Sequence, residues 1–440
     1  MTNITKKSIS EIIDTDLLDY SMYVLQNRAI PSAIDGFKSS GRKLVYAMLN
    51  DYPTRKVKVA ELAGSIAKYG FHHGESSAEG ATVTLTADWN NNCPVFTGHG
   101  NFGSRLIQEA AASRYIFVSL SPEFKKYFID TEVAPKSNDI ENPEPGHYLP
   151  TIPWVLVNGI EGISVGFACK ILPRSIADII FATKFCIKSQ DRFLKINKPI
   201  PPTFPHFKGT VAQESEDALS WSTTGIIKYI GKYTYQISEL PVGYDREQYI
   251  TILNNLCDSD KIKDYEDSCS EDGFGFSVKV STAQKEKIDE DPIKFFKLKK
   301  NYTENITTLG IDGKLKIFNS INSLIAYFCE YRLKKFGDKI EYEKESISLQ
   351  LKELSAKIKF ITDIINEKID FRKTTKSALL EYISDNITKE DFGKSFVNIS
   401  VINCTTDVLE TLQNKLKTLS ANYTVLENTT PLIRYLEVLK

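Results

Sequence analysis

The sequence predicts an α+β protein built from several domains. With 440 residues the chain is too long for one compact hydrophobic core, and this length is typical of two to four domains. Strand-like and helix-like segments alternate between residues 150 and 310, whereas the residues from about 319 onward have the period of long helices. A stretch rich in Pro and Gly at 135–153 predicts a linker that packs poorly, and we expect a domain boundary there.

The composition is that of an ordinary soluble protein, with 42% hydrophobic and 25% charged residues and a formal net charge of -1. Any surface that binds nucleic acid must therefore come from local segregation of Lys and Arg. No stretch approaches the ~20 apolar residues of a membrane span, and the N-terminus has no apolar run of signal-peptide length. The seven cysteines have no zinc-site spacing and read as free thiols of a reducing compartment. We expect a cytoplasmic protein that has no membrane contact and no metal site of its own.

Local patterns predict individual elements along the first two thirds of the chain. A helix is expected over 8–30, ending at Pro31, and a second one from Ser40 to Asn50. Between residues 55 and 120 short helices mix with Gly-rich turns. Further on, strands are expected at 211–216, 232–240 and 274–280, a helix at 245–256 and an acidic surface loop at 257–272.

Two heptad seams mark the last third of the chain. The first comprises Ile347, Leu351, Leu354, Ile358, Ile361 and Ile365, and the second Val408, Leu412, Leu416, Leu419, Tyr423 and Leu426. They predict an antiparallel pair of long helices with a small knob at the tip. A helical bundle in a compact core fits the periodicity equally well.

Tyr115 stands out by its context rather than its type, because the chain has 21 tyrosines. Arg114 directly precedes it, after three small residues at 111–113. A phenol that attacks a phosphate needs a nearby cation for the developing charge, and a guanidinium supplies one with bidentate geometry. Small residues allow a bulky duplex to come close. An Arg-Tyr pair on an ordinary surface explains the same letters.

Several other segments carry polar or glycine-rich patterns. Residues 98–103, GHGNFG, match a dinucleotide-binding turn, although no repeated βαβ rhythm surrounds them. His72 and His73 lie near Lys68 in a glycine-marked segment that suits phosphate contact, proton transfer or simply the start of a helix at Glu75 and Ser76.

Cations and apolar residues offer further alternatives. Lys38, Arg42 and Lys43 surround a helix start, with Arg28 upstream, and form either a phosphate-binding patch or a solvated charged face. Ile163 lies in an apolar, glycine-rich run at 157–168. It is either a core residue of a buried turn or an exposed side chain that inserts between base pairs.

Taken in order, these segments resemble the cleavage subunits of type IIA DNA topoisomerases. The matching pieces are LLDYSMYVLQNRAIPSAIDGFK, YGFHHGESSA, GHGNFGSR, AAASRY, IPWVLVNGIEGISVGFA, ISELPVGYDRE and the terminal helical seams. The family includes the A subunits of DNA gyrase and topoisomerase IV, and the resemblance is closer to the medium subunit of T-even-type bacteriophage topoisomerases. It covers nearly the whole chain and implies that GHGNFG is a loop beside the active site.

The resemblance implies roles for single residues. Tyr115 corresponds to the tyrosine that links to DNA, Arg114 to its transition-state partner and His73 to the active-site histidine. The residues expected to bind DNA are Arg28, Lys38, Arg42, Lys43, Lys68, His72, Ser76, Arg105 and the intercalating Ile163. Where many relatives have Lys-Pro-Val before a basic pair, this chain has Lys38-Ser39-Ser40-Gly41, which alters the phosphate contacts expected there.

The resemblance also implies the architecture and the assembly. We expect a winged-helix cleavage domain over 1–145, a mixed α/β tower over 146–318, and coiled-coil arms over 319–440 whose C-gate knob lies at about 370–405. The active enzyme would be ATP-dependent, with a homodimer of this chain inside a heterotetramer or larger complex. A partner subunit would hold Mg²⁺ and ATP.

The same resemblance bears on the activity and leaves two alternatives. Since the β-pinwheel that wraps DNA is absent, relaxation or decatenation is expected rather than supercoiling. A phage-encoded chain would act in the host cytoplasm. A DNA-bridging structural protein without cleavage activity and a dinucleotide-dependent enzyme are the alternatives.

Overall fold

The structure is a computed structural model that describes residues 7–128, 130–137, 142–189, 199–214, 219–370 and 374–440. It divides into two compact units. The first comprises Met1–Arg332 with Leu439, and the second Leu333–Val438 with Lys440. It is a mixed α/β fold in which the first unit holds all the described strands, because the last of them ends at Phe318.

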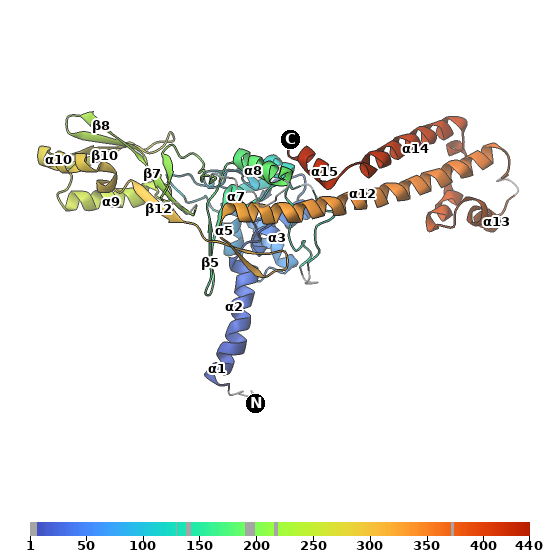
Figure 1. The fold of residues 1–440 in the computed structure, drawn as a ribbon, viewed down its shortest axis with the longest axis horizontal. Helices are drawn as coiled ribbons and strands as arrows, with labels where there is room; N and C mark the ends of the chain where they lie inside the picture. Colours follow the sequence, from blue (N-terminus) through green and yellow to red (C-terminus); the bar gives the residue numbers. More distant parts are fainter. Residues whose placement is uncertain (1–6, 129, 138–141, 190–198, 215–218, 371–373) are drawn as a thin grey trace. The chain divides into compact units, whose positions relative to one another are not determined.

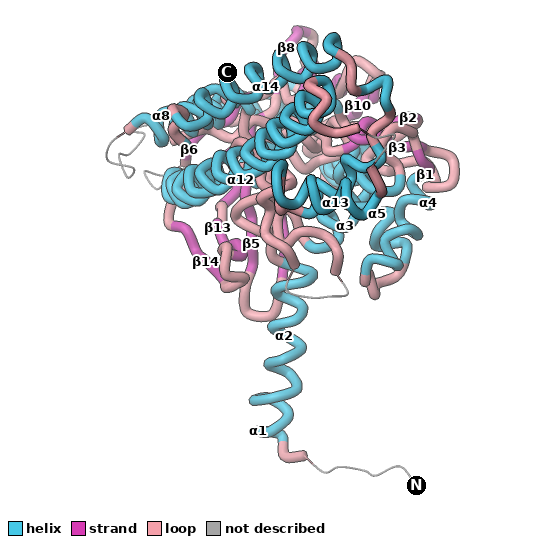
Figure 2. Tube along the Cα trace, turned by 90° about the vertical axis from the view of Figure 1, so that its right-hand side faces the viewer, coloured by secondary structure: helices cyan, strands magenta, loops and turns pink. Residues whose placement is uncertain are grey.

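The chain begins with a long helical stretch that projects from the rest of the first unit (Figures 1 and 2). It runs through α1 (Ile9–Glu11), η1 (Ile12–Leu17), α2 (Leu18–Val24) and η2 (Leu25–Ala29). A capping box between Ser8 and Glu11 satisfies its first free N–H groups. The backbone becomes extended at Ile30, before Pro31, so the predicted helix over 8–30 is confirmed.

Helices and a small sheet follow. The helices are α3 (Ser39–Asp51), α4 (Val59–Ser65), η3 (Ile66–Tyr69), α5 (Glu75–Thr86) and α6 (Pro122–Tyr127). The antiparallel sheet has the order β1-β3-β2, with β1 at Val57–Lys58, β2 at Phe96–His99 and β3 at Phe117–Leu120. Helix α3 confirms the helix expected at 40–50 and buries Leu44, Val45 and Met48. Helices beside a small antiparallel sheet suit a winged helix, which stays a prediction.

A projecting hairpin leads into the rest of the first unit. Helix α7 (Val155–Asn158) precedes the antiparallel strands β4 (Ile160–Ile163) and β5 (Ala168–Ile171), and α8 (Ile176–Lys188) follows them. A Cβ atom on Gly162 would lie 2.0 Å from the carbonyl oxygen of Ala29. Only glycine allows this close approach, which seats the hairpin on the end of the N-terminal helical stretch.

The remaining strands form three sheets. One has the order β12-β7-β6, from β6 (Thr210–Gln213), β7 (Ser220–Thr224) and β12 (Lys299–Thr303). Another has the order β10-β11-β9-β8, from β8 (Ile226–Gly231), β9 (Thr234–Glu239), β10 (Asp264–Asp267) and β11 (Phe276–Lys279). The last pairs β13 (Ile306–Leu309) with β14 (Leu315–Phe318). The four-stranded sheet shares a core with α9 (Arg246–Asp258), α10 (Thr282–Glu290) and α11 (Pro292–Phe295).

Most predicted elements of this region are confirmed, and two expectations are wrong. β6, β9, β11 and α9 lie where strands and a helix were expected, although 215–216 of the first strand fall outside the described residues. The loop expected at 257–272 contains β10, an edge strand whose alternating burial is hidden by its acidic composition. The described part of the stretch at 135–153, which leaves out 138–141, does not pack poorly, because Tyr148, Leu149 and Ile152 are buried.

The second unit is helical. Helix α12 (Ile321–Ile365) enters it from the first unit, and α13 (Lys376–Tyr382), η4 (Ile383–Ile387), η5 (Asp391–Asn398), η6 (Val401–Asn403), α14 (Thr406–Glu427) and α15 (Pro431–Val438) follow. Phe360, Ile369, Leu379, Ile383 and Phe396 form a small core. The positions of both heptad seams are buried or half-buried along α12 and α14. A coiled coil and a C-gate knob remain predictions.

A fully buried ion pair ties the hairpin to the strands behind it. Arg174 donates two hydrogen bonds to the carboxylate of Glu304, at 2.6 and 3.0 Å. The same carboxylate accepts a hydrogen bond from the backbone N–H of Leu172 at 2.8 Å. Both side chains have no exposed surface, so each charge depends on the other.

Replacing Glu304 by Ala should lower the free energy of unfolding of the first unit by about 3–5 kcal/mol, because a guanidinium would stay buried without a counter-charge. Urea titration followed by Trp fluorescence measures this, since Trp89, Trp154 and Trp221 all lie in that unit. Glu61→Ala is the control, because its pair with Arg55 is exposed and should contribute little. Equal urea midpoints for the two variants would contradict the assignment.

Candidate functional site

Tyr115 lies on a surface turn just before β3. Its N–H donates to the carbonyl oxygen of Ala112 at 2.9 Å, and its side chain is 67% exposed. The next residue, Ile116, is 2% exposed and packs in the core. Within the part of the chain that the structure describes, the hydroxyl of Tyr115 has no hydrogen-bond partner. The phenol is therefore presented to the surroundings of the protein.

Arg114 places a positive charge beside this phenol. Its guanidinium carbon lies 4.8 Å from the centre of the Tyr115 ring. Arg114 is exposed and makes no ion pair with any carboxylate of the described residues. The two side chains thus combine an accessible oxygen nucleophile with a cation that is free to bind an anion.

The GHGNFG segment supports the tyrosine turn by close packing. A Cβ atom on Gly100, where φ is +117°, would lie 2.7 Å from the side chain of Ile116. The carbonyl oxygen of Asn101 accepts a hydrogen bond from the N–H of Ala111 at 3.0 Å. Between Gly103 and β3, all of it described, the chain forms no helix. The dinucleotide interpretation is wrong, because that motif needs a helix N-terminus after its last glycine.

The two histidines precede α5. Gly70 takes a left-handed conformation and ends η3, and Gly74 is the N-cap of α5. The ring of His73 lies edge-on to Phe71, with the centroids 5.3 Å apart, while His72 is exposed. Ser76 is exposed on the first turn of α5. The segment is therefore the start of a helix and also an exposed polar cluster, so the helix start does not exclude phosphate contact.

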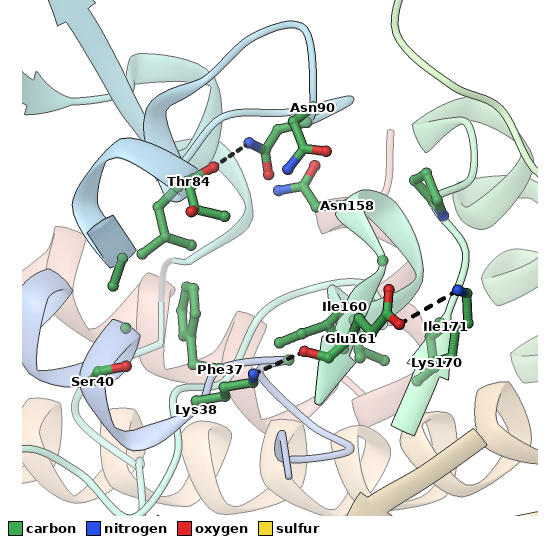
Figure 3. Close-up of a pocket in the computed structure, with 18 of the residues that line it drawn as sticks. Phe37, Lys38, Ser40, Thr84, Asn90, Asn158, Ile160, Glu161, Lys170 and Ile171 are labelled. Carbon is green, nitrogen blue, oxygen red and sulfur yellow. Dashed lines mark hydrogen bonds and ion pairs between the residues drawn. The ribbon is translucent and has the colours of Figure 1, made fainter. Parts of the chain in front are cut away.

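A groove of about 870 Å³ brings together six of the predicted site residues: Arg28, Lys38, Lys43, His72, His73 and Arg105. Its other walls include α5, the N-terminal helical stretch and the β4–β5 hairpin. Figure 3 shows the part lined by Phe37, Thr84 and the hairpin. The other six, Tyr115, Arg114, Arg42, Lys68, Ser76 and Ile163, do not line it.

Lys38 anchors the hairpin to the wall of this groove. Its ammonium donates a hydrogen bond to the carbonyl oxygen of Glu161 at 2.8 Å (Figure 3). The carboxylate of Glu161 pairs with Lys170 on β5 at 3.4 Å. Burial lowers the pKa of Lys38 below its ordinary value. Lys38 thus holds the hairpin as well as facing the groove.

The structure gives Arg42 and Lys43 internal partners, so the prediction that they bind DNA phosphates does not fit. Arg42 pairs at 2.9 Å with Asp35, which is fully buried. Lys43 is buried and pairs at 2.7 Å with Glu144. Lys43 thus holds the segment around residue 144 against α3, and Arg42 ties α3 to the loop before it. Their carboxylate partners neutralise the charge that the sequence pattern had assigned to the surface.

Arg105 is also used internally, whereas Lys68 and Arg28 are exposed. Arg105 donates to the carboxylate of Glu239 at 2.9 Å and to the carbonyl oxygen of Leu240 at 3.1 Å. Its predicted role in phosphate binding therefore does not fit either. Lys68 pairs with Asp51 at 2.9 Å, but its side chain is 55% exposed. Arg28 is exposed at the edge of the groove.

The tip of the β4–β5 hairpin is apolar and exposed. Ile163 is 79% exposed, so the alternative that it belongs to the core is wrong. Val165 and Phe167 are exposed beside it, at 53% and 40%, and sequence analysis missed both. The alternation of apolar and small residues around Gly166, where φ is +75°, was the available signal. Lys170, which lines the groove, was missed as well.

No described helix is long and apolar enough to cross a membrane. Nor do three or more His, Cys, Asp or Glu side chains of the described residues stand close enough to hold a metal ion. The titratable residues that this structure describes therefore do not by themselves fit a metal centre.

Comparisons with known proteins point to one family. A family model for the A subunits of DNA gyrase/topoisomerase IV matches residues 28–438. The chain is 34% identical to the DNA topoisomerase medium subunit of Enterobacteria phage T4, covering 94% of each. It is 31% identical to the mitochondrial DNA topoisomerase 2 of Dictyostelium discoideum, covering 92% of this chain and 33% of that protein.

A solved structure agrees with these relatives. The crystal structure of the Plasmodium falciparum topoisomerase II DNA-binding, cleavage and re-ligation domain matches with a TM-score of 0.86 at 28% identity. The match covers 98% of this chain and 63% of that one. The chain thus spans nearly the whole phage protein but only about a third of the Dictyostelium relative.

The packing of the hairpin can be tested through Cys169 on β5. Cys169 is fully buried, and burial raises the pKa of its thiol to about 12. A thiol with a raised pKa stays protonated at pH 8, and the thiolate is the reactive form. An alkylating reagent at pH 8, followed by peptide mass spectrometry, should therefore leave Cys169 unmodified in the native protein.

In urea the same thiol should be modified as fast as the half-buried Cys404, because its environment and its pKa return to those of an unfolded chain. Rapid alkylation of Cys169 without urea would show that the hairpin does not pack as described.

Proposed function

The chain belongs to the family of DNA gyrase/topoisomerase IV A subunits, and we propose that it is the DNA-cleaving and religating component of an ATP-dependent type II DNA topoisomerase. The observation that carries this proposal is the exposed phenol of Tyr115 with the guanidinium of Arg114 beside it. A tyrosine with a purely structural role is normally packed or hydrogen-bonded. The side chain of Tyr115 is largely exposed, and its hydroxyl has no hydrogen-bond partner among the described residues.

In the proposed reaction, the phenolic oxygen of Tyr115 attacks a backbone phosphate of the DNA. An O–P bond to the tyrosine forms as the bond between phosphorus and the 3′ oxygen breaks. The phenol loses its proton, the leaving 3′ oxygen gains one, and the 5′ phosphate remains on Tyr115. Because one phosphodiester replaces another, the reverse attack by the 3′ hydroxyl reseals the strand without an external energy source.

Neighbouring residues would assist the cleavage reaction or bind the DNA. Arg114 would stabilise the negative charge that develops on the phosphate oxygens. His73, which lies between the groove and the start of α5, would contact the same phosphate or its neighbour. Arg28, His72, Lys68 and Ser76 are exposed and would bind the backbone of the duplex. Lys38 would contribute chiefly by holding the hairpin.

The apolar hairpin tip would bend the duplex. Ile163 would insert between two base pairs and partly unstack them, which kinks DNA. The pairing of β4 with β5 and the close seat of Gly162 on Ala29 hold the tip against the resistance of the DNA. A bent duplex would follow the groove wall more closely than a straight one.

Cutting both strands requires two tyrosines, so we propose a two-fold dimer of this chain within a larger complex. The proposed division is a winged-helix cleavage domain over 1–145, a tower over 146–318 and coiled-coil arms over 319–440 with a C-gate knob at about 370–405. In such a dimer the arms would close a second gate on the far side of the break. A second duplex would pass through the opened DNA.

The complex would need further groups on a partner subunit. Because the described residues do not fit a metal centre, we propose that carboxylates of the partner bind Mg²⁺. When bound, this ion supplies charge stabilisation at the scissile phosphate. The partner would also bind ATP, and the complex would relax or decatenate DNA rather than supercoil it.

Replacing Tyr115 by Phe should abolish covalent DNA cleavage while leaving duplex affinity within a few-fold of wild type, because only the attacking oxygen is removed. The assay mixes the chain with its partner, Mg²⁺ and labelled duplex, quenches with detergent and counts the protein-bound label. A Tyr265→Phe variant serves as the control, since that hydroxyl is bound to Asn254. Equal cleavage by wild type and Tyr115→Phe would remove the proposed function.

Exposed and buried cations should differ in their effect on DNA binding. Arg28→Met should reduce the slope of log affinity against log salt by about one, because one phosphate contact is lost. Lys43→Met should leave that slope unchanged and lower the urea midpoint, since its ammonium is buried against Glu144. Fluorescence anisotropy of a labelled duplex over a salt series measures the slopes, and a reversal of the two results would refute the assignment.

A further inference from the structure

Few contacts decide where the phenol of Tyr115 stands. The preceding residues, 100–112, form no helix or strand. The carbonyl oxygen of Ser113 accepts a hydrogen bond from the N–H of Ala60 at 3.3 Å, and the N–H of Tyr115 bonds back to Ala112. The first of these bonds is long and the second is local. Just beyond the turn, the N–H of Val59 donates to the carbonyl oxygen of the buried Ile116 at 3.1 Å. The backbone therefore holds the turn firmly after Tyr115 and only weakly before it.

One side chain from another element reaches this turn. The hydroxyl of Ser113, two residues before Tyr115, donates a hydrogen bond to Oε1 of Glu79 at 2.6 Å. Throughout the described part of the chain, residues 111–115 make no other side-chain hydrogen bond. Both partners are half-buried, and hydrogen bonds to an ionised acceptor are shorter and roughly twice as strong as neutral ones.

Glu79 lies on α5, the helix that begins directly after His73 and Gly74. The contact therefore joins the turn that carries Tyr115 to the element that carries the histidines and the exposed Ser76. A carboxylate repels phosphate, so Glu79 gains nothing as a ligand of DNA. The hydrogen bond that this side chain makes is the one with Ser113.

We propose that Glu79 is a positioning residue, which holds Ser113 and thereby fixes the distance from the Tyr115 oxygen to the scissile phosphate. This inference rests on the proposed function. Attack requires the oxygen at ~3–3.5 Å from phosphorus and in line with the leaving group, and a misplacement of about 1 Å costs on the order of 100-fold in rate. Without the bond, the turn samples positions in which the phenol is out of reach while the duplex remains bound.

The test uses the full chain with its partner subunit, Mg²⁺ and a labelled duplex. The initial rate of covalent adduct formation is compared with the duplex affinity for each variant. Glu79→Ala and Ser113→Ala should each reduce the rate about 10-fold or more and leave the affinity within about two-fold. Glu79→Gln keeps an oxygen that accepts from Ser113, so it should retain most of the rate.

A double variant distinguishes positioning through Ser113 from two independent effects on the cleavage rate. If Glu79 acts through Ser113, Glu79→Ala combined with Ser113→Ala should be no slower than the slower single variant. Multiplying effects would overturn the proposal, as would a Glu79→Ala variant that cleaves at the wild-type rate. Ser113→Thr, which keeps the hydroxyl, should cleave faster than Ser113→Ala, and equal rates for these two would also count against the proposal.

Two further variants complete the design. Glu109→Gln removes a carboxylate charge from the irregular segment before Tyr115, where this exposed side chain makes no hydrogen bond with the described residues, and it should cleave normally. Tyr115→Phe tests the proposed function separately, because adduct formation by that variant would refute the function whatever Glu79 does. Should Glu79→Ala lower the thermal midpoint, Ser113→Ala decides the question, since it removes one oxygen from an irregular segment.

Discussion

The candidate chemistry of this protein depends on a reversal of burial between two adjacent residues. Ile116 is 2% exposed and Tyr115 is 67% exposed, at the point where an irregular segment enters β3. The buried isoleucine packs on Gly100, and pairing of β3 with β1 and β2 fixes the backbone immediately beyond it. Tyr115 lies on the turn that precedes β3, outside this packing, so its side chain faces the surroundings. The packing of Ile116 thus fixes the chain on one side of the phenol, and the bond of Ser113 to Glu79 restrains it on the other.

Only some of the Lys and Arg side chains at the candidate site are exposed to solvent. Arg42, Lys43 and Arg105 are neutralised by Asp35, Glu144 and Glu239, which lie far from them in sequence or deep in the fold. Arg28, Lys68 and Arg114 are exposed. A chain with a net charge of -1 can in this way offer a cationic surface locally. The internal pairs stabilise the walls of the groove, and the exposed cations are those that a phosphate backbone can reach.

The sequence predicted most helices and strands correctly, but it predicted poorly which residues are buried. The N-terminal helical stretch and α9 follow from period and capping, which act within a few residues. The edge strand β10 was missed because acidic residues mask its alternation, and the burial of Tyr148 near a run of Pro and Gly depends on packing against distant residues. The internal role of Lys43 was unpredictable for the same reason, as Glu144 comes from another segment, whereas the partner of Arg42, Asp35, is only 7 residues away and its burial was not foreseen. Family resemblance singled out Tyr115, which the residues around it alone did not.

The most direct test of Tyr115 as the DNA-linked residue is to identify the amino acid that carries the DNA. The chain, its partner, Mg²⁺ and a duplex are mixed and quenched with detergent, the protein is digested, and the DNA-bearing peptide is sequenced by mass spectrometry. A peptide containing Tyr115, joined through its phenolic oxygen to a 5′ phosphate, is the predicted result. DNA attached to another side chain, or strands cut with no peptide attached, would contradict it.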